Sequence, residues 1–173
     1  MNNFILEYYQ KIMDGSEIAG QWIILAYDMI VRSLQDKVYY YDPKKAQAII
    51  YYFENFVHHT KGRSDLVKLE LWQKAGLSAM FGIVDEDGHR WYNEVAWKMG
   101  RKQGKSLIAY GVGEYMFLPF DGEYGSEVYC LAPKLDQADI IYNNVWQMTL
   151  LDPEYQKMKE DLSERDAHNK KVK

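Results

Sequence analysis

The sequence predicts an α/β protein in which a helical N-terminal subdomain precedes a parallel sheet with flanking helices. Three observations lead to this prediction: apolar residues at helical spacing in the first third, a run of period two over residues 91–97, and a Gly-Lys-Ser tripeptide between that run and a further apolar helix. We expect the helical subdomain over residues 1–62, the sheet-containing domain over residues 63–151, and a charged helical or frayed tail over residues 152–173.

The composition is that of a globular protein with room for one sizeable core. The chain has 173 residues, of which 47% are hydrophobic and 27% are charged. Its net charge of −4 gives no overall footprint for nucleic acid, although Lys98, Arg101, Lys102 and Lys105 form a local basic patch. No segment approaches the roughly 20 apolar residues of a membrane span, so we expect no membrane contact and a cytoplasmic location. The single cysteine, Cys130, rules out an internal disulfide framework.

Two amphipathic helices are predicted within the N-terminal subdomain. The first follows Ser16, which is a suitable N-cap, and the second follows Asp42, with Pro43 at its first helical position. These helices could form a docking surface, but the favoured interpretation is a compact subdomain that covers one side of a larger domain. The predicted apolar stripes are Ile18, Trp22, Leu25, Met29 and Ile30 in the first helix, and Ala46, Ile49, Ile50, Phe53 and Val57 in the second.

The middle of the chain begins with a polar segment, residues 58–65, that is typical of a linker. The adjacent His58 and His59 do not predict a metal site, because neighbouring helical positions point apart and no further ligand stands at suitable spacing. A short extended segment and a helix are predicted over residues 66–82, followed by a turn at residues 85–88. The alternating run then predicts a strand with Trp91, Asn93, Val95 and Trp97 on one face.

Beyond the tripeptide the sequence predicts a helix, a turn at Asp121 and Gly122, a buried strand over residues 127–132, and an amphipathic helix over residues 135–150. Cys130 lies inside the predicted strand without a basic neighbour, so it is interpreted as part of the core rather than as a nucleophile. The resulting order of strand, loop, helix, strand and helix is that of the start of an α/β nucleotide-binding sheet.

The tripeptide Gly104-Lys105-Ser106 predicts a phosphate-binding loop. The usual pattern, G-x-x-x-x-G-K-[ST], would place its first glycine at Met99, and the chain has Gly100 one position later. The position between strand and helix nevertheless suits phosphate, because backbone N–H groups and the positive end of the helix dipole are available there. Gly104 would allow close approach, Lys105 would reach the β- and γ-phosphates, and Ser106 would bind Mg²⁺. The prediction is therefore an incomplete P-loop NTPase, and the alternative is a helix N-terminus with a solvated lysine.

Three stretches of the sequence resemble the large terminase subunit of tailed bacteriophages, in the N-terminal part of its ATPase domain. They are YYYDPKKAQAIIYYFENFVHHTKG, WQKAGLSAMFGIVDEDGHRWYNEVAWKMGRKQGKS and FLPFDGEYGSEVYCLAPKLDQA. Their order and spacing are similar to those of the family, and the resemblance covers nearly the whole chain as far as about Leu151. It implies part of a motor that packages viral DNA into procapsids and uses ATP and Mg²⁺.

The resemblance also implies roles for individual residues. The family carries a phosphate loop of the form R-x-x-G-K-[ST], and Arg101 stands at the place of its arginine. Arg101 and Lys105 would act catalytically on the γ-phosphate, and Ser106 would be the metal ligand. Gln103 departs from the asparagine often found there, which leaves the backbone cradle unchanged. Trp72 and Gln73 match the pair with which the family reads adenine. The implied nucleotide-binding set is Trp72, Gln73, Arg101, Lys102, Gln103, Gly104, Lys105 and Ser106.

The carboxylates that ATP hydrolysis requires are missing from their expected place. An aspartate for Mg²⁺ and a glutamate for water should follow a further strand, but Asp136 and Asp139 fit a helix, and Asp161 and Glu164 lie in the polar tail. We therefore expect a chain truncated before the Walker B strand and the nuclease, which binds ATP but does not hydrolyse it alone. By resemblance its partners would be the remaining part of the large subunit, the small terminase subunit, the portal protein and duplex DNA, in the host cytoplasm.

Two alternatives belong to other classes. The chain could be a non-catalytic fragment or interaction module, derived from a split or remnant terminase. It could also be another P-loop motor, such as a helicase-like protein, although Trp72, Gln73 and Arg101 argue against that interpretation.

Overall fold

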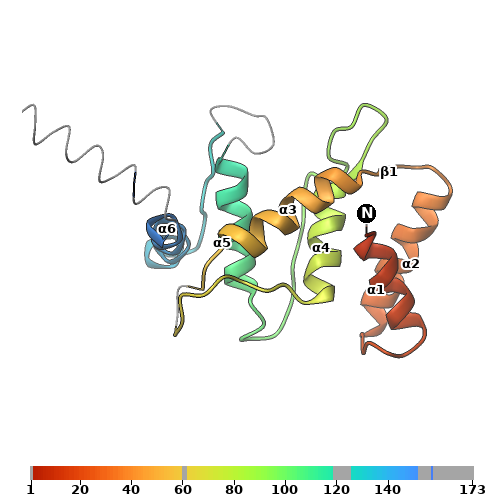
Figure 1. Cartoon of the computed structure of the whole chain (residues 1–173), viewed down its shortest axis with the longest axis horizontal. Helices are drawn as coiled ribbons and strands as arrows, with labels where there is room; N and C mark the ends of the chain where they lie inside the picture. The colour runs from red at the N-terminus through yellow and green to blue at the C-terminus, as the bar shows by residue number, and fades with distance from the viewer. Residues whose placement is uncertain (1, 60–61, 119–125, 152–156, 158–173) are drawn as a thin grey trace, which may run out of the picture. The chain divides into compact units, whose positions relative to one another are not determined.

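A computed structural model describes residues 2–59, 62–118, 126–151 and 157 of the chain (Figure 1). The chain forms two compact units. The first unit consists of Met1–Glu54 and Lys68–Lys98, and the second unit consists of Asn55–Val67 and Met99–Lys173. Within the described ranges, no helix is both long enough and apolar enough to cross a membrane. The domain limits expected from the sequence remain predictions.

The first unit is built around helix α1 (Phe4–Met13), which packs between α2 (Gln21–Gln35) and α4 (Leu71–Gly82), as Figure 1 shows. Asn3 starts α1 because its side-chain Oδ1 accepts the backbone N–H of Leu6 at 3.1 Å. The buried core of this unit draws on all three helices and on the segments that join them. It includes Ile5, Tyr8, Ile12, Tyr27, Ile30, Val31, Tyr39, Ala75 and Ile83.

Helix α2 forms as predicted but buries a different face. It begins at Gln21 rather than after Ser16, because Ser16 lies in the turn that ends α1, where the Asp14 carboxylate accepts its N–H at 2.8 Å. Ile30 is the only member of the predicted stripe that is buried, together with Tyr27 and Val31. The other predicted core positions are exposed, namely Ile18, Trp22, Leu25 and Met29. The periodicity could not identify the buried face because α2 is apolar on two sides.

Helix α3 (Pro43–Phe56) matches its prediction closely. The Asp42 carboxylate accepts the N–H groups of Lys44 and Lys45 at 2.8 and 3.2 Å, so Asp42 is the N-cap and Pro43 is the first helical residue. The predicted apolar stripe is buried throughout, at Ala46, Ile49, Ile50, Phe53 and Val57. Unlike α2, this helix has charged or polar residues on its other faces, so the sequence pattern indicated a single buried face.

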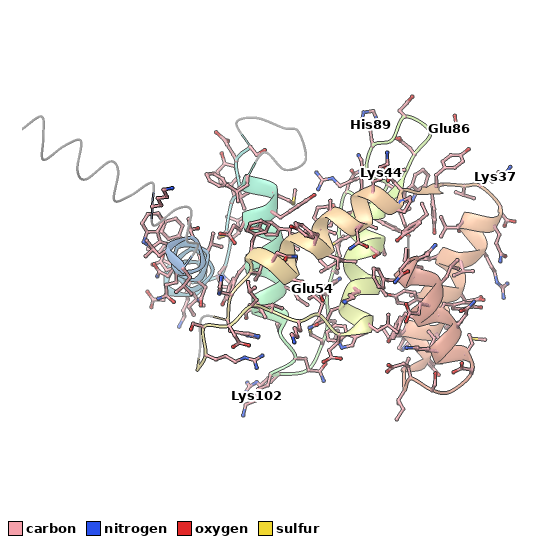
Figure 2. All side chains as sticks on the ribbon, in the orientation of Figure 1. Lys37, Lys44, Glu54, Glu86, His89 and Lys102 are labelled. Carbon is pink, nitrogen blue, oxygen red and sulfur yellow. The ribbon has the colours of Figure 1, made fainter. Side chains whose placement is uncertain are left out.

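The predicted parallel sheet is not present among the described residues. Their only sheet pairs β1 (Tyr40–Tyr41) with β2 (Ile83–Val84) in the antiparallel sense, with Tyr40 opposite Val84 and Tyr41 opposite Ile83. The turn predicted after β2 is confirmed, because Asp85 Oδ1 accepts the N–H groups of Asp87 and His89 at 3.0 and 2.8 Å. In Figure 2 this turn carries the labelled side chains of Glu86 and His89 at its tip.

The predicted strand over residues 91–97 is wrong. These residues follow an irregular path after an isolated bridge between Val84 and Arg90, and the Trp91 N–H bonds to the Ile83 carbonyl at 2.9 Å. Trp97 lies over Gly76 of α4, where an added Cβ would approach the indole ring to 2.9 Å. A strand requires a neighbouring strand for its hydrogen bonds, and the described part of the chain offers none here. Aromatic contacts with helices therefore replace the predicted ladder.

The second unit contains α5 (Lys105–Phe117) and α6 (Leu135–Leu151), both predicted as helices, and they pack against each other. The segment predicted as a linker closes on itself through a bridge between His58 and Leu66. The predicted strand over residues 127–132 is also wrong: its residues form no ladder with any described segment, and Cys130 is only half-buried rather than part of a core. The predicted turn at Asp121 and Gly122, and nearly all of the tail, lie outside the described residues.

Candidate functional site

The tripeptide singled out in the sequence lies at the N-terminus of α5. Gly104 is the N-cap residue, and its carbonyl accepts the N–H of Ile108 at 2.9 Å to close the first turn. No side chain caps this end of the helix. The first N–H groups of α5 are therefore available to an external acceptor, and the helix dipole places partial positive charge at the same point. Ile108 is buried, and its packing fixes the first turn of the helix in place.

The backbone of the preceding loop is unusual at two positions. Gly104 adopts φ 77° and ψ 8°, in the left-handed region, where an N-cap residue is ordinarily extended. Lys102 has φ 66°, and a non-glycine residue adopts that conformation only at an energetic cost. Residues that alternate between right- and left-handed conformations turn successive N–H groups toward one concave surface, which suits an anion. The left-handed conformation of Lys102 is thus located where a phosphate-binding backbone would require it.

The side chains of the loop are largely accessible to solvent. Arg101, Lys102, Gln103, Lys105 and Ser106 are exposed, and Gly104 is half-buried. Neither Arg101 nor Lys105 forms an ion pair with any residue of the described ranges. Figure 2 shows the labelled Lys102 side chain extending away from the ribbon. Three cations and a hydroxyl group at an uncapped helix N-terminus fit a nucleotide triphosphate with its Mg²⁺, and Ser106 is the residue that would hold the metal.

Gly100, the glycine displaced by one position from the usual pattern, does not have a positive φ. A Cβ added there would lie 3.7 Å from Gln103 Nε2, which is an ordinary contact distance. The loop therefore requires glycine at Gly104 but has room for a side chain at Gly100.

The two other predicted contacts, Trp72 and Gln73, lie in α4 and so belong to the first unit, whereas the loop belongs to the second unit. Gln73 takes part in a capping box: its Oε1 accepts the Glu70 N–H at 2.9 Å, and the Glu70 side chain caps Gln73 in return. Trp72 is half-buried and packs against the ring of Trp97, with 6.5 Å between ring centroids. Both residues thus have structural roles of their own, and Gln73 still has its amide N–H₂ to offer.

Among the described residues of the second unit, the buried carboxylate Glu114 lies away from the loop. Glu114 is buried on α5, about 15 Å from Gly104 along the helix axis, and its Oε1 accepts the Thr149 hydroxyl of α6 at 3.0 Å. Asp136 and Asp139 are exposed near the start of α6. No three His, Cys, Asp or Glu side chains gather as a metal site within the described ranges. Glu114 therefore joins two helices and is not a ligand of the loop.

Sequence reasoning missed two features of this site. The first is Glu70, whose place three residues before a glutamine at the start of a helix was a readable capping signal. The second is the left-handed backbone of Lys102, for which the sequence gives no signal because lysine rarely adopts it.

An uncapped helix N-terminus preceded by a strained, glycine-containing, cationic loop is an arrangement suited to an anion such as phosphate. Comparison with protein families agrees and is more specific. The chain belongs to the family of the terminase large subunit ATPase domain, whose model matches residues 71–170. Searches of curated proteins and of solved structures gave no significant match. Membership makes the chain a component of a DNA-packaging motor that uses a nucleotide.

Proposed function

We infer that the chain is the ATP-binding N-terminal portion of a viral terminase large subunit. The observation that carries this inference is the uncapped N-terminus of α5, with left-handed backbone at Lys102 and Gly104. In this role the N–H groups of the loop surround the phosphates, Lys105 contacts the β- and γ-phosphates, and Ser106 holds Mg²⁺. Arg101 neutralises charge on the γ-phosphate from within the same chain. Lys102 and Gln103 complete the cradle.

Calorimetry with Mg-ATP tests the site. Lys105→Ala should weaken binding by about 1.5–3 kcal/mol, or roughly 10- to 150-fold, because it removes a charge-assisted contact with phosphate. Lys134→Ala is the matched control, since Lys134 is also an exposed lysine of the second unit. Equal affinities for the wild type and Lys105→Ala would show that the loop does not hold the phosphates.

Gln73 reads the adenine edge in this proposal, and its capping role must be separated from that function. Gln73→Ala removes both the base contact and the acceptor for the Glu70 N–H. Gln73→Glu keeps an acceptor at the same place but lacks the amide N–H₂. Both variants should lose preference for ATP over GTP in competition binding, whereas only Gln73→Ala should destabilise α4, by about 0.5–2 kcal/mol. Unchanged preference in Gln73→Glu would leave Gln73 with the capping role alone.

Hydrolysis needs an aspartate for Mg²⁺ and a glutamate for water, and the sequence after Cys130 has no hydrophobic strand that ends in two acids, so the chain alone should bind ATP without turnover. A phosphate-release assay on purified monomer tests this, and turnover abolished by Lys105→Ala would show that the catalytic acid is already present. A polypeptide that supplies such a strand and its two acids should restore turnover. In the assembled motor the partners would be the rest of the large subunit, the small subunit, the portal protein and duplex DNA, in the host cytoplasm.

A second candidate function, that of a non-catalytic interaction module, is favoured by the exposed apolar residues of the second unit. Tyr129, Leu131 and Leu135 are exposed, as are Tyr142 and Trp146 of α6. The calorimetric experiment separates the two functions, because an interaction module need not bind Mg-ATP at all.

A further inference from the structure

Trp97 packs against helix α4 at a position where the helix has no side chain. Its indole lies over Gly76, where an added Cβ would approach Cζ2 to 2.9 Å and Cη2 to 3.4 Å. Glycine in the middle of a helix is less favourable than alanine, because it loses more backbone freedom on folding. Gly76 therefore gives up helix propensity and leaves room for the indole ring.

The same part of α4 carries the two residues assigned to the nucleotide base. Trp72 and Gln73 precede Gly76 by four and three positions, so all three are neighbours on one surface of the helix. The ring of Trp97 also contacts that of Trp72, with 6.5 Å between centroids and 48° between planes. Trp97 and these α4 residues all belong to the first unit. Trp97 thus lies over the helix surface from which Gln73 extends.

The surroundings of the two tryptophans decide which ring is available to a base. Trp72 packs against the buried core of the first unit and also contacts Trp97. Two rings at this distance touch each other directly, so a third ring does not fit between them. Trp97 is half-buried, and part of its ring is open to solvent. A base would therefore stack on the accessible part of Trp97, with Trp72 supporting the indole.

The position of Trp97 in the sequence links this ring to the phosphate loop. Trp97 stands four residues before Arg101, so the chain itself keeps their Cα atoms within about 14 Å of each other. One short segment therefore has an aromatic ring for the base at its start and the cations for the phosphates at its end.

We propose that Trp97 stacks on the base of the bound nucleotide and supplies affinity without selecting the base. This inference rests on the proposed function and adds to it a residue outside the predicted nucleotide-binding set. Every base has a π-face, so stacking on an aromatic ring tolerates adenine and guanine alike, whereas hydrogen bonds to the base edge distinguish them. Trp97 and Gln73 therefore have separate tasks: the first holds the base, and the second identifies it.

Calorimetry with Mg-ATP, Mg-GTP and inorganic Mg-tripolyphosphate tests this division. Trp97→Leu should weaken both nucleotides by the same factor, at least about fivefold, and should leave tripolyphosphate, which has no base, unchanged. Trp97→Phe keeps an aromatic face and should restore most of the lost affinity. Trp91→Leu is the matched control: it removes another tryptophan of the same segment, which contacts Tyr39 at 5.3 Å between centroids, and should change none of the three affinities.

A second variant displaces the indole without removing it. Gly76→Ala puts a Cβ where the ring now lies, so the indole must move away from α4. Alanine favours the helix, and circular dichroism should show that α4 remains folded. Both nucleotides should again bind more weakly than to the wild type, while the affinity for tripolyphosphate stays the same.

Three results with Trp97→Leu overturn the proposal. Unchanged nucleotide affinity would leave Trp97 with packing on α4 alone, and an equal loss for tripolyphosphate would show that Trp97 acts on the phosphate loop. A loss confined to ATP would show that the residue selects the base. The failure of the proposed function looks different, because the wild type would then bind neither tripolyphosphate nor the nucleotides in a manner that depends on Lys105, and the role of Trp97 would fail with it.

Discussion

The two units of this molecule differ in how their helices are packed. In the first unit α1 is enclosed by α2 and α4, and residues from distant segments, such as Tyr39 and Ile83, close the core around it. In the second unit α5 and α6 pack against each other, but Tyr129, Leu131 and Leu135 remain exposed. The first unit thus has a buried core drawn from three helices, although α2 still exposes Trp22, Leu25 and Met29, and the second unit is a pair of helices attached to a candidate phosphate loop.

This difference follows from the partners that helices and strands each require. An amphipathic helix needs one apolar neighbour, and the first unit supplies it through nearby helices. The strands predicted on either side of the loop need other strands to take up their backbone hydrogen bonds, and the described residues supply none. The loop itself still forms, because its turn depends on local backbone conformation and on the buried Ile108.

The strongest test of the comparison removes the same side-chain atoms from each unit. Ile5→Ala in α1 empties a fully buried position, at 0% exposure, and should cost about 2–5 kcal/mol of unfolding free energy. Ile140→Ala in α6 changes a residue that is 48% exposed and should cost less than about 1 kcal/mol. Urea unfolding followed by circular dichroism measures both. Similar losses of unfolding free energy in the two variants would show that the two helices are equally well packed.

The helices were predictable from the sequence to the extent that each had a single apolar face. In α3 the N-cap Asp42, the following Pro43 and one apolar stripe all indicated the same helix, and the structure confirms each. In α2 the two apolar faces made the existence of the helix predictable but not its orientation. Residues 91–97 and 127–132 had strand-like sequences, but strand formation is decided by distant partners that a local pattern does not contain.

Within the loop, Gly104 and Gly100 provide a matched pair of glycines. Gly104→Ala forces a side chain into the left-handed region at φ 77° and should destabilise the turn by about 1–2 kcal/mol. Gly100→Ala places its Cβ at an ordinary 3.7 Å from Gln103 and should be tolerated. The unfolding temperature and the affinity for Mg-ATP should both fall for Gly104→Ala, and both should stay near the wild-type values for Gly100→Ala. The reverse order would show that Gly100, and not Gly104, carries the turn.

The residues of the candidate site could be proposed from the sequence, and their role in binding a nucleotide stays a prediction, whereas the geometry of the loop could not be proposed. The tripeptide and Arg101 could be identified from the sequence, and the structure places Gly104 at the start of α5. The positive φ of Lys102 could not be predicted, since it depends on how the whole loop closes. The engagement of Gln73 by Glu70 followed a known capping signal that competed with the family-based role for the same side chain.

The smallest expected effect concerns the segment of the second unit that precedes the loop. Arg63 lies 2.6 Å from His59 Nε2, so the neutral imidazole accepts a hydrogen bond from the guanidinium there. Burial, and then the charge of Arg63, lower the pKa of His59 below its ordinary value of 6.5. Because the folded chain disfavours the protonated ring, His59 contributes stability above pH 6.5, and this contribution is lost as the pH falls through its lowered pKa.

The wild type should therefore lose slightly more stability between pH 7 and pH 5 than His59→Gln, which cannot be protonated in this range. His58→Gln serves as the control, because it changes the neighbouring histidine and leaves the contact between Arg63 and His59 in place. Hydrogen exchange of the Val67 N–H, which bonds to the Val57 carbonyl at 2.9 Å, reports on this segment alone. If exchange at Val67 responds to pH equally in the wild type and in His59→Gln, protonation of His59 does not affect the stability of this segment. The described part of this segment would then depend on its remaining contacts, among them the bond from the Val67 N–H to the Val57 carbonyl and the burial of both valines.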